Sequence, residues 1–241
     1  MVRELPKEER GCLWDLIGDW SESTLKTCIQ GYDGSAWMAD GSAMLQVRDF
    51  CFFVGTPSEE LLAAVDQGLT GKILVPQHAD WETLLASWFG DRALRETRYA
   101  ILKEPDAFDP ENLRRLVSQL PEGYVLQPFN AALYEQAAAQ EWSNDHWPIT
   151  DVGMTVTWQG ELVAAASPFS RYDGGIEVQI DTRIDHRNRG LATACGAALV
   201  LQCLERGLYP SWDAKHMGSV RIAERLGYHF DKPYSSFFIE R

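Results

Sequence analysis

The spacing of apolar and polar positions predicts alternating helices and strands along the whole chain. Apolar residues three and four positions apart indicate helices, and short apolar or alternating runs indicate strands. In the first 120 residues, we expect helices over 8–19, over 21–30, from Pro57 onward, over 81–89 and over 109–120. The strands expected between them cover 36–39, 44–55, 71–76 and 95–103.

The turn at Pro121-Glu122-Gly123 is the best candidate for a domain boundary. After it we expect strands over 124–128, 152–159, 161–167, 176–183, 208–213 and 234–240. The helices expected among them cover 131–141, 191–206 and 219–226. The sequence therefore predicts a mixed α/β protein with a smaller α/β domain over 1–120, whose role the sequence leaves open, and a second domain over 121–241.

Composition narrows the class of partner. The 241 residues include 35 acidic and 22 basic ones, a net charge of −13, which repels phosphate backbones and argues against a nucleic-acid partner. The same charge suits a small cationic acceptor, or serves only to keep the protein soluble. No apolar run is long enough to span a membrane, and the charged N-terminus is unlike a signal peptide, so we expect a cytoplasmic protein without a membrane partner.

Cysteine and histidine spacing argues against disulfides and metal. The five cysteines include no CxxC pair, and no histidines form an HExxH or a His-x₃₋₅-His pattern. We expect reduced, buried thiols and no metal site.

The segment 176–193, IEVQIDTRIDHRNRGLAT, holds the strongest chemical signal. Strand alternation places Ile176, Val178, Ile180 and Thr182 on one face and Glu177, Gln179, Asp181 and Arg183 on the other. The strand leads through an arginine-rich turn into a long helix that is rich in alanine and glycine. Such a helix can pack closely on a sheet.

The start of that helix is a candidate anion site. A helix N-terminus presents free amides and the positive end of the helix dipole, and Gly190 lets backbone approach a phosphate closely. Flanking arginines would add to the attraction. Neither GxGxxG nor GxxxxGK[ST] occurs, so dinucleotide and P-loop sites lack their motifs. The alternative is an ordinary strand-to-helix junction with a glycine for packing.

Arg187, Gly190 and Ala192 form an R-x-x-G-x-A pattern that resembles the pyrophosphate loop of the GNAT superfamily. Longer segments resemble the subfamily that includes the zwittermicin A resistance acetyltransferases, namely YDGGIEVQIDTR, RGLATACGAALVLQCLERGLYPSWDA, SVRIAERLGYHF, TRYAILKEPDAFD and LPEGYVLQPF. The resemblance implies the GNAT acyl-CoA N-acyltransferase fold in the C-terminal half, with acetyl-CoA as co-substrate.

The resemblance also implies the residues that hold the co-substrate. The pantetheine arm would pair with the strand at Ile180, Asp181 and Thr182. The pyrophosphate would lie on the loop and the first helical turn, formed by Arg187, Asn188, Arg189, Gly190, Leu191, Ala192 and Thr193. His216 and Ser219, near the start of the following helix, complete the implied cofactor site.

Acetyl transfer to an amine needs a group that accepts the ammonium proton. Glu177 is the preferred catalytic base because it lies on the polar face of the strand, with Asp181 as a second catalytic candidate. A cross-strand salt bridge or a solvated carboxylate is the alternative for Glu177.

Other groups are candidates with structural alternatives. The superfamily's tyrosine acid is replaced here by Ala223, and Tyr228 and Tyr234 are either substitutes for it or packed aromatic residues. His146, together with Glu141, Trp142 and Asp145, stands where family members build the acceptor wall. It is a second candidate base or a structural histidine.

The function that these features favour is transfer of acetyl from acetyl-CoA to an amine of a small molecule, by direct attack in a ternary complex. A non-catalytic acyl-CoA sensor or interaction module is the alternative, because the tyrosine is missing. A toxin-type enzyme acting on aminoacyl-tRNA is disfavoured by the acidic charge. The sequence leaves the acceptor's identity open and allows a homodimer.

Overall fold

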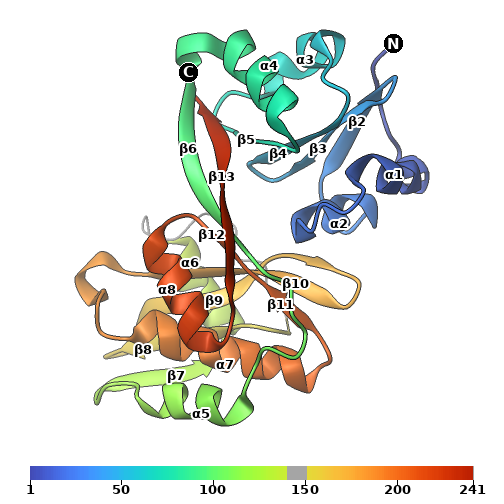
Figure 1. Ribbon diagram of the computed structural model, residues 1–241. Coiled ribbons are helices and arrows are strands. Elements are labelled where there is room, and N and C mark those ends of the chain that lie inside the picture. Colours follow the sequence, from blue (N-terminus) through green and yellow to red (C-terminus); the bar gives the residue numbers. More distant parts are fainter. Residues whose placement is uncertain (140–150, 241) are drawn as a thin grey trace. The chain divides into compact units, whose positions relative to one another are not determined.

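The computed structural model describes residues 1–139 and 151–240, which form two compact units (Figure 1). The first unit contains Met1–Arg98 with Pro233–Arg241, and the second contains Tyr99–Lys232. The boundary predicted near residue 120 falls inside the second unit. The reason is that α5 (Pro110–Ser118) packs against the long helix α7 (Leu191–Glu205) and belongs to its core.

The first unit is built on most of an eight-stranded sheet, whose strand order is β1-β2-β3-β4-β5-β13-β6-β12. Its strands are β1 (Arg3–Glu4), β2 (Ser35–Ala39), β3 (Ser42–Val47), β4 (Phe50–Gly55), β5 (Ile73–Pro76) and most of β6 (Ala93–Ile101). Its helices are η1 (Lys7–Cys12), α1 (Leu13–Ile17), α2 (Ser23–Ile29), α3 (Glu59–Val65), η2 (Asp66–Gly68), α4 (Ala79–Phe89) and η3 (Gly90–Arg92). A core that includes Phe53, Trp81 and Leu85 joins α3 and α4 to the sheet.

The prediction of one strand over 44–55 was wrong. The segment contains two antiparallel strands, β3 and β4, joined by a tight turn at Arg48-Asp49. Arg48 takes a left-handed backbone conformation with φ of 55°. Such a conformation usually calls for glycine or asparagine, so the sequence carries no hairpin signal at this point.

The C-terminal strand β13 (Phe230–Ile239) completes the first unit. It pairs antiparallel with β5 through Phe237 and Leu74, and both side chains lie in the core of this unit. The chain therefore passes from one unit to the other twice, once in β6 and once in β13.

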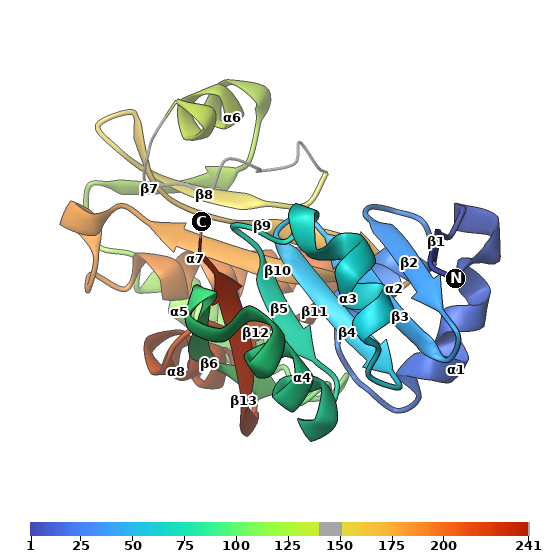
Figure 2. The same ribbon diagram turned by 90° about the horizontal axis from the view of Figure 1, so that it is seen from above.

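The second unit is built on a five-stranded sheet with the order β11-β10-β9-β8-β7. Its strands are β7 (Tyr124–Pro128), β8 (Met154–Trp158), β9 (Glu161–Tyr172), β10 (Gly175–Thr182), β11 (Tyr209–Ser211) and the short β12 (Asp213–Ala214). Besides α5 and α7, its helices are α6 (Ala131–Ala138), η4 (Ile184–His186) and α8 (Met217–Leu226). Figure 2 shows α6 on one side of the sheet and α7 on the other.

Strand β9 is covered on both faces, which explains why its sequence is apolar without alternation. Leu162 and Ala165 pack against α6, whereas Val163 and Ala166 belong to the core that contains α7. A strand covered on both faces needs no polar side.

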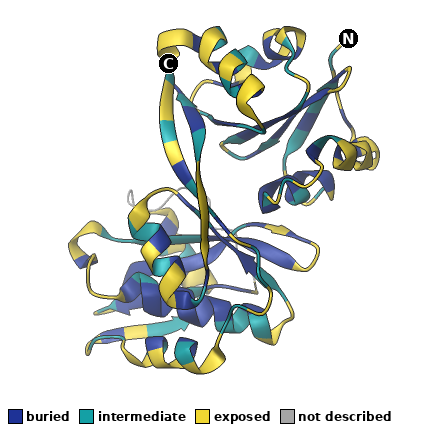
Figure 3. Cartoon of the chain, viewed as in Figure 1, coloured by how far each residue is buried: buried dark blue, intermediate teal, exposed yellow. Residues whose placement is uncertain are grey.

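Helix α7 is buried along most of its length, as Figure 3 shows. The close packing expected from its small residues is confirmed at Gly196. A side-chain carbon added there would lie 2.8 Å from Cδ1 of Ile180 and 3.1 Å from Cδ1 of Leu226. Glycine at this position therefore lets α7 approach β10 and α8 closely.

The cysteines are free thiols, and only Cys12 is exposed. Burial raises the pKa of Cys28 to about 11 and that of Cys51 and Cys203 to about 12, so these thiols stay protonated near neutral pH. Within the described parts of the chain, no helix is both long and apolar enough to cross a membrane.

Candidate active site

Two neighbouring strands of the second unit separate at Glu177. Strand β10 pairs in parallel with β11 only as far as Glu177 opposite Ser211, and then continues to Thr182 with β9 as its partner. After Trp212 the chain leaves this sheet, and Asp213 pairs with Ala100 of β6 instead. The predicted strand over 208–213 is therefore divided into β11 and β12. Among the described strands, none pairs with the β11 side of residues 178–182, so this edge can accept an extended ligand.

The loop after β10 presents backbone amides. Asn188 and Gly190 both adopt left-handed conformations, with φ of 60° and 80°, and Gly190 is the N-cap of α7. The first bond within the helix runs from the amide of Ala194 to the carbonyl of Gly190, and no side chain caps this end. A side-chain carbon added at Gly190 would meet no atom within 4 Å. The helix thus opens with uncapped amides beside open space, which suits a diphosphate.

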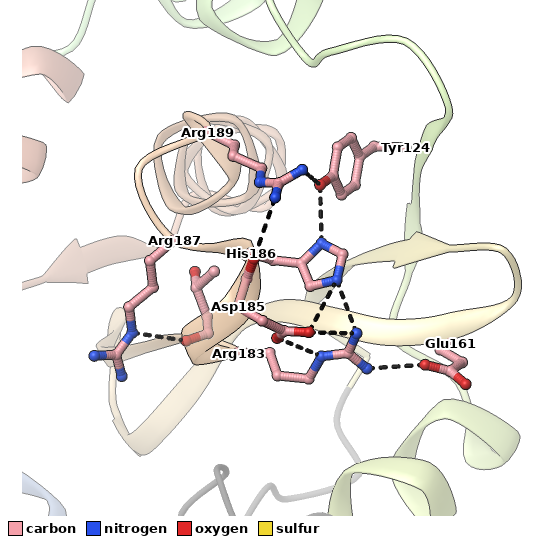
Figure 4. Close-up of polar contacts among 8 residues, drawn as sticks. Tyr124, Glu161, Arg183, Asp185, His186, Arg187 and Arg189 are labelled. Atoms are coloured by element: carbon pink, nitrogen blue, oxygen red, sulfur yellow. Dashed lines mark hydrogen bonds and ion pairs between the residues drawn. The ribbon is translucent and has the colours of Figure 1, made fainter.

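The arginines of the loop have different partners, as Figure 4 shows. Arg183 is held by ion pairs to Asp185 and Glu161, at 2.8 and 2.9 Å. Arg187 donates to the carbonyl of Thr182 at 3.1 Å, and Arg189 donates to the hydroxyl of Tyr124 at the same distance. Arg183 is thereby neutralised locally. Within the described residues, Arg187 and Arg189 form no ion pair, so their charge is available to an anion.

His186 lies at the centre of this network and was not assigned a role from the sequence. Its Nε2 lies 2.8 Å from the Arg183 guanidinium, which can only donate, so Nε2 accepts. Nδ1 then carries the proton and donates to the Tyr124 oxygen at 2.8 Å. Burial lowers the pKa of His186, and the guanidiniums of Arg183 and Arg189 lower it further. The Asp185 carboxylate acts in the opposite direction. No local signal reveals the pair, because Tyr124 lies 62 residues away in sequence.

Protonation of His186 should loosen this loop. Its pKa in the folded protein lies below the ordinary value of 6.5, so below about pH 6.5 the unfolded chain binds more protons than the folded one. Stability should therefore fall as the pH falls through the interval between the two values. In His186→Gln we expect a smaller difference between the melting temperatures at pH 5.5 and pH 7.5. Circular dichroism at pH 8 controls for lost packing. If the variant kept the wild-type difference in melting temperature, His186 would not be the group whose protonation loosens the loop.

Glu177 is buried at the point where the strands separate, with 5% of its surface exposed. Its register partners on the two neighbouring strands are Ser170 and Ser211, both buried. Burial raises the pKa of Tyr209 and of Tyr228, and the Glu177 carboxylate adds to both shifts. The carboxylate thus lies in a buried polar cluster at the base of the open strand edge.

The two tyrosines considered as acids have different surroundings. Tyr228 is buried and donates to the carbonyl of Pro210 at 2.6 Å, and its pKa is raised well above 10. Tyr234 belongs to the first unit, where its hydroxyl accepts from Arg98 at 3.2 Å. Ala223, at the position of the superfamily tyrosine, is fully buried in the core.

The predicted alternation of β10 is confirmed. Ile180 faces Gly196 of α7, whereas Asp181 accepts a hydrogen bond of 3.2 Å from Gln179 on the opposite face. Burial raises the pKa of Asp181, against the effects of Gln179, Arg187 and Lys215. Asp181 therefore lies on the polar face, four residues nearer the loop than Glu177.

His216 and Ser219 fix the start of α8. Nδ1 of His216 accepts from the amide of Ser219 at 3.1 Å, and the Ser219 hydroxyl accepts from the indole of Trp212 at 3.0 Å. The structure thus gives both residues a role in positioning α8 beside the end of β11. Glu141, Trp142, Asp145 and His146 lie outside the described residues.

Known proteins include a family that matches nearly the whole chain. The sequence matches the GNAT acetyltransferase family over residues 15–237. A curated relative, the uncharacterized N-acetyltransferase YdfB of Bacillus subtilis (strain 168), is 22% identical over 99% of this chain and 98% of its own length.

Solved structures show the same fold. A GCN5-related N-acetyltransferase-like protein from Streptococcus suis 89/1591 is 37% identical, with a TM-score of 0.88 over 97% of this chain and 99% of that one. A GCN5-related N-acetyltransferase from Kribbella flavida is 17% identical, with a TM-score of 0.62 over 91% and 93%. With the family match extending over both units, the chain belongs to the GNAT acetyltransferase family.

Proposed function

We propose that this protein transfers an acetyl group from acetyl-CoA to a primary amine of a small molecule. The observation that carries the proposal is the open edge of β10 leading directly into the uncapped start of α7. The free strand edge suits the amide groups of a pantetheine arm, and the helix start suits a diphosphate. Coenzyme A joins these two groups in one molecule.

The residues of this chain fit that co-substrate. Asn188 and Gly190, in left-handed conformations, and the first turn of α7 would hold the pyrophosphate through backbone amides. Arg187 and Arg189 would add positive charge beside it. When bound, acetyl-CoA supplies an activated thioester whose carbonyl carbon accepts the amine.

Glu177 would remove the proton that keeps the amine from attacking. Its carboxylate lies in a buried cluster at the base of the open edge, where it can accept that proton. The C–N bond then forms as the C–S bond breaks, the nitrogen gives up its second proton to solvent, and the thiolate takes up a proton from solvent. The thiolate is a tolerable leaving group because thiol pKa values lie near 8.5.

The acceptor we propose is a small cationic amine. The net charge of −13 attracts such molecules. The resemblance of several segments to the zwittermicin A resistance acetyltransferases also points to small amino-containing metabolites.

Binding and turnover test the proposal together. We expect acetyl-CoA to bind with a Kd of roughly 1–100 μM in calorimetry, and one amine in a panel to release free thiol. Failure to bind at about 1 mM would contradict the proposal.

One observation favours a second function. The buried Ala223 removes the family's hydroxyl acid, which suits a protein that binds acyl-CoA without turnover. Binding without thiol release across the whole panel would support this alternative.

A further inference from the structure

A cavity of about 400 Å³ lies in the second unit beside the start of α7. Helix α5, the first turn of α7 and the end of α8 supply its walls, through Arg115, Leu116, Gln119, Gly190, Thr193 and Arg225. Its size is that of cavities that hold small ligands. Gly190 and Thr193 border both this cavity and the candidate pyrophosphate site.

Two guanidinium groups give the cavity a positive wall. Arg115 lies on α5 and Arg225 on α8, and within the described residues neither forms an ion pair. Asn112 links the two helices, because its side-chain oxygen accepts from Arg115 and its amide donates to the carbonyl of Arg225 at 3.1 Å. In a chain with a net charge of −13, two arginines without carboxylate partners on one cavity indicate an anionic ligand.

We propose that Arg115 and Arg225 bind the 3′-phosphate of coenzyme A and so select it over dephospho-coenzyme A. This inference rests on the proposed function. Coenzyme A carries a diphosphate and, on its ribose, a separate phosphate monoester. The amides at the start of α7 can take the diphosphate, and the cavity beyond Gly190 and Thr193 then receives the ribose end. Guanidinium groups suit a phosphate monoester because they donate two parallel hydrogen bonds to it.

The test compares two ligands that differ only in this phosphate. Calorimetry with the full-length protein should show that coenzyme A binds at least tenfold more tightly than dephospho-coenzyme A. Arg115→Gln and Arg225→Gln should each weaken coenzyme A binding by roughly tenfold, since a hydrogen bond to a charged group is lost. Their affinity for dephospho-coenzyme A should change less than about twofold, because that ligand lacks the phosphate that the arginines contact.

Arg114→Gln is the matched control. Arg114 is the neighbour of Arg115 on α5, is exposed, and does not line the cavity. The change in net charge is the same, so a general electrostatic effect would weaken binding in the control as well. Both ligands should bind this variant as they bind the wild type.

The outcomes separate this inference from the function on which it rests. Equal affinity of the wild type for the two ligands, or equal losses for both ligands in the arginine variants, would overturn the assignment and leave the proposed function standing. Failure of the folded wild type to bind either ligand would overturn both. Thermal melts of each variant show whether a loss of binding reflects unfolding.

Discussion

Replacing Glu177 by glutamine should lower the rate of acetyl transfer by roughly 10²–10⁴ at neutral pH, the usual contribution of a general base. Glutamine keeps the size and the hydrogen-bonding oxygen of the side chain but cannot accept the ammonium proton. Affinity for acetyl-CoA should change little, because Glu177 lies below the open strand edge and away from the loop. Steady-state kinetics and calorimetry on the same variant separate the two effects.

The pH–rate profile distinguishes a base from a structural carboxylate. In the wild type, we expect an ascending limb that reports ionisation of the base, and in Glu177→Gln this limb should shift or disappear. Glu205→Gln makes the same chemical change at the exposed end of α7 and should keep both the rate and the profile. If Glu177→Gln retained the wild-type profile, the role would pass to Asp181 or to solvent.

Gly190→Asp should weaken acetyl-CoA binding by about 100-fold or more. The new carboxylate would extend into the open space that the uncapped helix start presents, where it would oppose the diphosphate. Placing like charges together costs several kcal/mol. Calorimetry at moderate ionic strength measures the loss directly.

Two further variants isolate charge from strain. Gly190→Asn has the same shape as Gly190→Asp and tolerates the left-handed conformation, but carries no charge, so it should bind more tightly than the aspartate variant. Gly207→Asp makes the charged change just after α7, at a glycine with φ of 65° and equally open surroundings. It should bind as the wild type does. Normal binding by folded Gly190→Asp would place the phosphate site elsewhere.

Local signals in the sequence were sufficient to predict most helices and strands and the loop that begins α7. The helices predicted from Pro57, from 109 and from 131 begin within two residues of those positions, after N-caps at Ser58, Asp109 and Asn130 whose side chains accept from first-turn amides. The strand, the arginine-rich turn and the small residues of α7 lie within one short segment. Their arrangement therefore depends on neighbouring residues, and sequence patterns report such arrangements well.

Features that depend on distant residues were not predictable. Tyr124 bonds His186 from 62 positions away, and Arg115 and Arg225 meet at one cavity although they lie on different helices. Strand β11 ends opposite Glu177, and two residues later Asp213 pairs with Ala100 of β6. Nothing near Asp213 in the sequence indicates that partner. The single boundary near residue 120 differs from the observed division because α5 packs against α7, and because Phe237 pairs with Leu74.

The pairing of β13 with β5 determines the order in which the two sheets can form during synthesis. Residues 1–98 leave the ribosome long before β13 is synthesised. Strand β5 therefore remains an edge strand while all of Tyr99–Lys232 is being made. Its residues Leu74 and Val75 are apolar, and an uncovered apolar edge readily pairs with the wrong strand. All five strands of the second unit's sheet lie within Tyr99–Lys232, whereas the first unit lacks the partner of β5 until residues 230–239 are made.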